Sequence, residues 1–295
     1  MGSGIGAGGD AIELLIEPRA RPVGDGEVDR LLPFRSRRMV GPFVFADLMG
    51  PDPLPPGVGV DVPSHPHIGL ATVTYLFDGA LMHRDSTGAV QRIDPGGVNW
   101  MTAGRGVAHS ERSPDDAREG ESTIAGLQTW VALPDHAEEI EPGFEHVAAS
   151  DVPVLVEGDA SVRVLAGSHG GVEAPVRVFS PLFHLDVALV DGGRWSLGTE
   201  HTERCVVVID GSVSVAGVPV PPRHLAVLAP AIAVDVVADG RARVMSFGGT
   251  PVGERYIVWN FVSSDRDRIR AAETAWRAGD WPEVPGDPER VELSA

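Results

Sequence analysis

The amino-acid sequence predicts an all-β fold, built as two β-barrels in tandem and closed by one C-terminal helix. The 36 glycines and 25 prolines are typical of a chain with many turns and short strands. Strand-like apolar segments recur at short intervals, and two of them, TVTYLFDG and RCVVVIDG, end in an Asp-Gly pair. With 295 residues, of which 43% are hydrophobic, the chain is long enough to bury two cores.

The strands are expected where apolar residues run between Gly and Pro, at Thr72–Phe77, Gln128–Ala132, Arg163–Ala166, Phe183–Leu189, Cys205–Ile209 and Ala242–Phe247. The Asp-Gly pairs at Asp78-Gly79 and Asp210-Gly211 predict a hairpin after the first and the fifth of these. Because both pairs lie in similar surroundings, we interpret the two halves as copies of one barrel, the second diverged from the first.

The last apolar pattern of the chain is helical. Ile269, Ala272 and Trp276 recur at helical spacing, which predicts one helix of about four turns with Ser264 as its N-cap. The expected organisation is then a disordered N-terminus at 1–10, a metal-binding N-terminal barrel at 11–135, an acidic linker at 136–152, a C-terminal barrel without metal at 153–262, and the helix and tail at 263–295.

The charge and the cysteine content exclude several classes of protein. The chain carries 24 Lys+Arg, all of them arginine, against 42 Asp+Glu, so its net charge of −18 opposes direct binding to nucleic acid. The single cysteine, Cys205, rules out an intramolecular disulfide and fits a reducing compartment. No signal peptide and no apolar run of ~20 residues is visible, so we expect a cytoplasmic protein without membrane contact. A monomer is expected, since no exposed apolar seam stands out.

Two short motifs carry the chemistry of the sequence. His65 and His67 are two residues apart, as are His109 and Glu111, and on strands such residues point to the same face. If the two strands face each other inside a barrel, three imidazoles and one carboxylate converge, a set that suits Fe(II), Mn(II), Ni(II) or Zn(II). From spacing alone, ordinary surface or core histidines are an equally good interpretation.

Longer segments around these motifs resemble the pirin family of the cupin superfamily, and the resemblance covers nearly the whole chain. It is carried by HPHIGLATVTYLFDG, HRDSTG, PGGVNWMTAGRGVAHSE and GLQTWVALP, which begin at residues 65, 83, 95 and 126. The resemblance implies two tandem cupin barrels of the jelly-roll type, with one metal ion per chain, usually iron, in the N-terminal barrel. By position, its ligands fall on His65, His67, His109 and Glu111.

The sequence departs from the pirin pattern beside these ligands. Pirins usually have a basic residue at position 68 and a glutamate at position 71, where this chain has Ile68 and Ala71. Other cupins use a glutamate near position 71 as a metal ligand, so its absence leaves Glu111 as the only carboxylate of the predicted set.

The remaining histidines are given simpler interpretations. His83, in HRDS, is read as a surface turn residue in preference to a residue behind the metal ligands or at the pocket entrance. His184, His201, Glu203 and His224 are read as solvated loop residues of the second barrel, and Cys205 as a buried side chain.

The resemblance implies a function of the quercetin 2,3-dioxygenase type, acting on a small flavonol or catechol-like substrate. The expected cofactor is Fe(II), with Mn, Ni or Zn as alternatives, and Glu111 is the expected ligand that also accepts the substrate's hydroxyl proton. The alternative is an iron-dependent, redox-sensing regulatory protein that binds a protein partner. A metal-dependent isomerase or hydrolase is a third hypothesis, which zinc in the site would favour.

Overall fold

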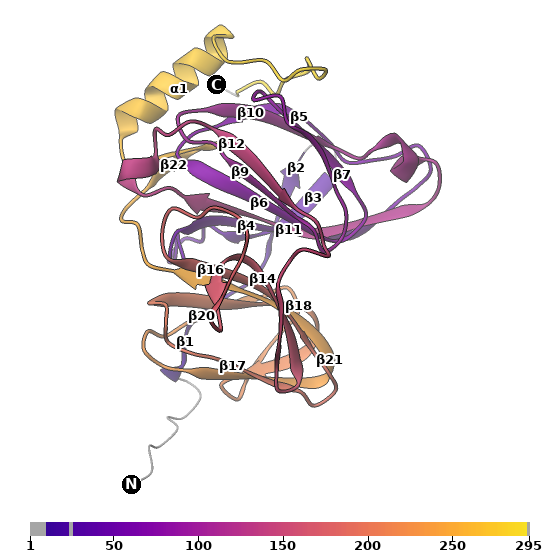
Figure 1. Ribbon diagram of the computed structural model, residues 1–295, viewed down its shortest axis with the longest axis vertical. Helices are drawn as coiled ribbons and strands as arrows, with labels where there is room; N and C mark the ends of the chain where they lie inside the picture. The colour runs from indigo at the N-terminus through magenta and orange to yellow at the C-terminus, as the bar shows by residue number, and fades with distance from the viewer. Residues whose placement is uncertain (1–9, 24–25, 294–295) are drawn as a thin grey trace. The chain divides into compact units, whose positions relative to one another are not determined.

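The computed structural model describes residues 10–23 and 26–293 (Figure 1). Within them lie strands β1 to β23 and one α-helix, α1 (Arg266–Ala278), which lies near the C-terminus. The predicted all-β fold with a single C-terminal helix is therefore confirmed. The expected disorder at 1–10 falls almost entirely outside the described residues.

The chain forms two compact units. Of the described residues, the N-terminal barrel unit holds 20–23, 26–30, 44–151 and 252–293, and the C-terminal barrel unit holds 10–19, 31–43 and 152–251. No helix in the described part of the chain is both long and apolar enough to cross a membrane.

The N-terminal barrel unit is built from two antiparallel sheets. The larger sheet has the strand order β12-β9-β6-β11-β4-β3-β2, and the smaller one β5-β10-β7-β8. The larger comprises β2 (Arg19–Val23), β3 (Gly26–Leu32), β4 (Phe43–Leu54), β6 (Leu70–Asp78), β9 (Val98–Thr102), β11 (Ser122–Ala132) and β12 (Gly143–Val147). The smaller comprises β5 (Asp61–His67), β7 (Leu81–Asp85), β8 (Val90–Ile93) and β10 (Val107–Arg112). Two 3-10 turns, η2 (Asp115–Arg118) and η3 (Asp135–Ala137), flank β11.

The described strands of the C-terminal barrel unit form a single sheet of ten strands. Its main path runs β1-β20-β18-β21-β16-β14-β13, and β15, β17 and β19 pair with β14, β21 and β18. The strands are β1 (Ile12–Ile16), β13 (Val154–Glu157), β14 (Ala160–His169), β15 (Val172–Glu173), β16 (Leu182–Leu189), β17 (Arg194–Leu197), β18 (Glu203–Val215), β19 (Val218–Val220), β20 (Leu225–Leu228) and β21 (Val234–Gly249).

The two Asp-Gly pairs do not form the predicted hairpins. β6 ends at Asp78, but β7 belongs to the other sheet, so the chain crosses between sheets there. Gly79 has φ 80°, and a Cβ on it would lie 2.3 Å from the carbonyl oxygen of Thr123. β18 continues through Asp210 and Gly211 with irregular register on both sides. The pair at 78–79 lies where the chain passes from one sheet to the other, whereas the pair at 210–211 is an irregularity inside β18, so the hairpin prediction is wrong for both.

Pairing between distant strands also explains why the units differ from the expected ranges. β1 pairs with β20, which places the first described strand in the C-terminal barrel unit. β12 lies in the segment expected to be a linker and pairs with β9. Apolar patterning marks strands but carries no information on which distant strand completes the ladder.

The C-terminal segment completes the N-terminal barrel unit. The ribbon β22 (Tyr256–Val258) with β23 (Phe261–Ser263) precedes α1, and Ile269, Ala272 and Trp276 of α1 pack with Phe261. The N-cap is Asp265 instead of Ser264, because its side chain accepts the Asp267 amide at 2.8 Å. α1 is thereby fixed to the unit that holds the site described next.

Candidate metal centre

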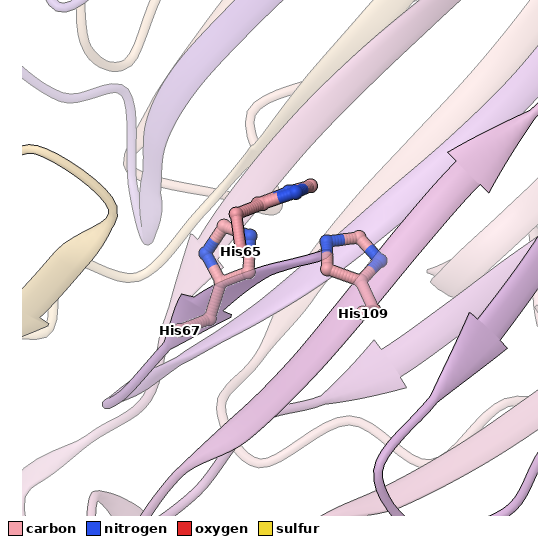
Figure 2. A group of neighbouring side chains, drawn as sticks. All are labelled: His65, His67 and His109. Carbon is pink, nitrogen blue, oxygen red and sulfur yellow. The ribbon is translucent and has the colours of Figure 1, made fainter. Parts of the chain in front are cut away.

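Three of the predicted ligands meet on neighbouring strands. β5 and β10 are antiparallel partners, and His109 lies opposite His65 in the register. His65 and His67, two residues apart on β5, share a face. Figure 2 shows the three rings turned toward one another, and one nitrogen of each lies within 4.8 Å of the other two.

The hydrogen bonds of the rings decide which nitrogen is free. His65 Nδ1 lies 2.9 Å from the carbonyl oxygen of Pro63, and His67 Nδ1 lies 3.2 Å from that of Asn260. Each Nδ1–H can donate to its carbonyl, which leaves Nε2 with a lone pair. The Nε2 atoms of His67 and His109 are buried and have no hydrogen-bond partner in the described chain. Buried ring nitrogens without a partner are what a bound metal ion would satisfy, so the residues fit a metal.

Burial also sets the protonation of the three rings. All three are at most 8% exposed, and burial lowers the pKa of each below its ordinary value. For His67 and His109 the pKa is lowered well below that value, and the adjacent imidazoles contribute to the shift. The three rings are therefore neutral near pH 7, the form in which imidazole binds a metal.

Glu111 lies beside the three histidines but outside their compact group. The β5–β10 register shifts between His109 and Glu111, so the two are not placed by a regular strand. The Glu111 carboxylate accepts hydrogen bonds from Thr74 Oγ1 at 3.0 Å and from Gln128 Nε2 at 3.0 and 2.8 Å. The predicted fourth ligand is thus held by two side chains of the larger sheet, β6 and β11.

Gln128 was not identified as a site residue from the sequence. The only signal was a polar residue inside the apolar strand GLQTWVALP, which also contains Thr129. Its function depends on contact with Glu111 from a strand of the other sheet, and spacing along one strand cannot reveal such a contact.

His83 is not the surface turn residue that we expected. It lies on β7, is 3% exposed and stacks on Phe144 with ring centroids 4.3 Å apart. Its Nδ1 lies 3.4 Å from Nδ1 of His109, and its Nε2 lies 3.0 Å from Oδ2 of Asp85. The expectation failed because residues 81–85 form a strand, and in β7 alternate residues are buried.

A cavity of about 640 Å³ adjoins the histidines within the N-terminal barrel unit. His65, Glu111 and Gln128 line it, and so do the aromatic rings of Phe45 and Trp130. These two rings stack with centroids 3.9 Å apart and planes 10° apart. The volume is within the range of about 300–1,000 Å³ that small-molecule sites occupy.

The residues that depart from the family pattern do not line this cavity. Ile68 is 1% exposed and packs in the cluster of Phe261 and α1. Ala71 is fully buried on β6. Both substitutions therefore change the packing of the barrel wall and leave the cavity lining as it is.

The residues of the C-terminal barrel unit that the sequence singled out pack against or bind other residues of that unit. His184 is fully buried, with its ring 5.5 Å from those of Phe43 and Phe247, so it is not a loop residue. Glu203 accepts the Gly41 amide at 2.6 Å. Cys205 is buried as expected, and burial raises the pKa of its thiol.

Comparison with known proteins agrees with this architecture. The profile of the pirin family matches residues 26–131, and that of the pirin C-terminal cupin domain matches residues 184–282. A "Pirin-like protein" of Caulobacter vibrioides is 45% identical over 271 residues, which cover 91% of this chain and 94% of that protein.

Two solved structures share the fold across nearly the whole chain, and both are of quercetin 2,3-dioxygenase from Acinetobacter baumannii. One has a TM-score of 0.90 at 32% identity and covers 98% of this chain and 96% of its own. The other has a TM-score of 0.87 at 28% identity and covers 93% and 99%. With two cupin domains and relatives of this similarity, the chain belongs to the pirin family.

Proposed function

We propose that this chain is a metal-dependent oxygenase of the quercetin 2,3-dioxygenase type, acting on a flavonol or a related catechol. The observation that carries the proposal is that the three-histidine group opens, through His65, into a cavity with a stacked aromatic wall. The Acinetobacter baumannii structures named quercetin 2,3-dioxygenase, with TM-scores of 0.90 and 0.87, support the choice of reaction.

The proposed cofactor is one Fe(II) ion held by His65, His67 and His109, with Glu111 as a fourth ligand. Three neutral imidazoles and one carboxylate leave a divalent ion with a net charge of about +1, which favours an anionic oxygen donor. When bound, such an ion lowers the pKa of a substrate hydroxyl and lets the substrate share electron density with O₂. Mn, Ni and Zn fit the same donor set, but zinc has no redox chemistry and would point to an isomerase or hydrolase.

Glu111 is the proposed acceptor of the substrate's hydroxyl proton. Its Oε1 already accepts hydrogen bonds from both Thr74 and Gln128, whereas Oε2 accepts one, from Gln128. A carboxylate oxygen can accept two hydrogen bonds, so one position on Oε2 stays open for the metal ion, and Glu111 takes the substrate's proton when a hydrogen bond from Gln128 gives up its place. Thr74 and Gln128 fix the orientation of the carboxylate, and the stacked rings of Phe45 and Trp130 offer a flat surface to an aromatic substrate.

The charges around the cavity restrict the substrate further. Among the described residues, its lining contains one guanidinium, Arg30, which is bound to Asp47 through two hydrogen bonds of 2.9 and 2.7 Å. The carboxylates of this described lining are those of Glu27, Asp47, Asp52, Asp61 and Glu111. This excess of negative charge disfavours substrates that carry a carboxylate of their own. A neutral polyphenol that loses a proton only at the metal fits better.

The test is oxygen uptake by anaerobically Fe(II)-loaded protein mixed with quercetin, beside the variants His109→Ala and His136→Ala. His136 is exposed, outside the cavity and outside the three-histidine group, so it serves as the matched control. We expect uptake in the parent and in His136→Ala, and none in His109→Ala. Protocatechuate, a catechol that bears a carboxylate, should be consumed far more slowly than quercetin. An iron-bound parent that consumes no oxygen with flavonols or catechols would refute the proposal and favour a redox-sensing regulatory protein.

Glu111→Gln tests the proposed base separately. Removing a general base typically costs a factor of about 10²–10⁴ in rate. We expect a loss of this size, measured with the variant saturated with iron. A variant that keeps at least half of the parent's turnover would show that Glu111 is not the proton acceptor.

A further inference from the structure

His83 and Asp85 form a buried hydrogen-bonded chain behind one of the three histidines. His83 lies between Nδ1 of His109, at 3.4 Å, and Oδ2 of Asp85, at 3.0 Å. His83 is 3% exposed, and Asp85 is fully buried. Neither residue lines the cavity, so neither can contact a substrate there.

The directions of these hydrogen bonds follow from the state of His109. With Nε2 of His109 reserved for a metal, its Nδ1 carries the proton and must donate. Nδ1 of His83 is then the acceptor, so the proton of His83 sits on Nε2 and is donated to Asp85. The carboxylate of Asp85 can only accept, so it fixes which ring nitrogen donates and which accepts in both hydrogen bonds.

Asp85 is itself held in place by its own turn. Its Oδ1 accepts hydrogen bonds from the Thr87 amide at 2.8 Å, the Thr87 hydroxyl at 2.6 Å and the Ala89 amide at 3.2 Å. Four donors thus converge on this carboxylate, three on Oδ1 and Nε2 of His83 on Oδ2, so both oxygens act as acceptors, as in an ionised carboxylate. The plane of the His83 ring is set by Phe144, which stacks on it at an interplanar angle of 22°.

The other two histidines lack such a chain. Nδ1 of His65 and Nδ1 of His67 face neutral backbone carbonyl oxygens, those of Pro63 and Asn260. Within the described chain, His109 alone of the three is connected to a carboxylate by hydrogen bonds, through the ring of His83. Partners of this kind orient a ligand ring and raise its basicity, and their removal typically weakens metal binding 10–100-fold.

We propose that His83 and Asp85 are positioning residues that fix the tautomer of His109 and make it the most electron-donating of the three imidazoles. Stronger electron donation by His109 favours the ferric over the ferrous ion. The hydrogen bonds through His83 and Asp85 therefore lower the Fe(III)/Fe(II) potential of the bound iron. The inference rests on the metal site of the proposed function, but not on its reaction with oxygen or on its substrate.

Three substitutions separate the steps of this inference. Asp85→Asn keeps the shape of the side chain but replaces one of the two accepting oxygens by an NH₂ group. Either His83 or the Thr87 turn then faces a donor where it had an acceptor. His83→Asn puts an amide oxygen near the position of Nδ1, which keeps an acceptor for His109 but removes the connection to Asp85. His83→Leu removes the acceptor altogether. His136→Asn, an exposed histidine of the same unit, is the control.

The experiment is an anaerobic titration with Co(II), followed by its visible absorption, and a potentiometric titration of the iron-loaded proteins. We expect Co(II) affinity to fall 10–100-fold in His83→Leu and Asp85→Asn, and less in His83→Asn. Each tenfold loss of preference for Fe(III) over Fe(II) raises the potential by about 59 mV, and we expect a rise of this order in Asp85→Asn and in His83→Asn.

Affinities within twofold of the parent and an unchanged potential in folded Asp85→Asn and His83→Leu would overturn the inference. If Asp85→Asn fails to fold because its turn is lost, His83→Asn leaves that turn intact, and an unchanged potential in it is then the contradicting result. A parent that binds no Co(II) would instead refute the metal site, and hence the proposed function. If the parent binds metal but consumes no oxygen, the affinities and potentials of the variants still decide whether His83 and Asp85 act on His109.

Discussion

The fully buried histidine of the C-terminal barrel unit makes the fold sensitive to acid in a way that can be calculated. His184 is 0% exposed, packs edge-on against Phe43 and Phe247, and has no hydrogen-bond partner on either ring nitrogen within the described chain. Burial lowers the pKa of His184 from 6.5 to about 3, although the charge of Asp186 opposes the shift. The folded protein therefore holds this ring neutral over a pH range in which the unfolded chain protonates it.

The sign and size of the effect follow from proton linkage. Below pH 6.5 the unfolded chain binds a proton that the folded chain does not, so the free energy of unfolding falls as the pH falls toward 3. At pH 5 the loss amounts to about 2 kcal/mol, while at pH 7 it is only about 0.2 kcal/mol. His184→Leu removes the titrating group but keeps an apolar side chain against the two phenylalanines.

The assay is urea unfolding at pH 7 and pH 5, with the free energy of unfolding obtained at each pH. The difference between the two values should be about 2 kcal/mol smaller in His184→Leu than in the parent. His224→Leu, at a partly exposed histidine of the same unit, controls for the loss of a histidine as such. Identical pH dependence in the parent and in His184→Leu would refute the reasoning, because the buried ring would then not be held neutral.

Three further predictions concern the N-terminal barrel unit. Gly69→Ala should destabilise the protein by about 2 kcal/mol or more in thermal unfolding, since Gly69 has φ 66° and a Cβ would lie 2.1 Å from the Val262 carbonyl oxygen. Arg112→Gln should lower the free energy of unfolding by about 2 kcal/mol and speed proteolysis after residue 284, because Arg112 holds the C-terminal segment through two hydrogen bonds to Asp287. An unchanged rate of proteolysis would contradict this role. Ni(II) at 100 times its Kd should stabilise the protein by about 2.7 kcal/mol in calorimetry, and the same concentration should stabilise His67→Ala by about 0.4 kcal/mol or less.

The sequence predicted which histidines form the site better than it predicted which side chains of other strands contact them. Motifs with a spacing of two residues identified His65, His67 and His109, because strand geometry converts that spacing into a shared face. The same logic missed Gln128, whose amide reaches Glu111 from the other sheet. It also misassigned His83, since HRDS looks like a turn until β7 pairs with β10.

The fold shows the same division between local and distant information. The helix was predicted to within two residues at its start, because caps and apolar spacing are local properties. The strand that β1 joins and the use of β12 in the first barrel could not be predicted, since both depend on pairing between distant residues. The Asp-Gly pair at 78–79 marks a true turn, but the turn joins two sheets instead of two paired strands.

The proposed function depends on His65, His67 and His109 holding one metal ion together. The most direct test is the metal content and Kd of purified protein after anaerobic loading with Fe(II), measured for the parent and for His67→Ala. We predict one ion per parent chain and at least a hundredfold weaker binding in the variant, which loses a ligand whose Nε2 is otherwise buried without a partner. A folded parent that binds no metal, or a variant that binds it as tightly as the parent, would contradict the account.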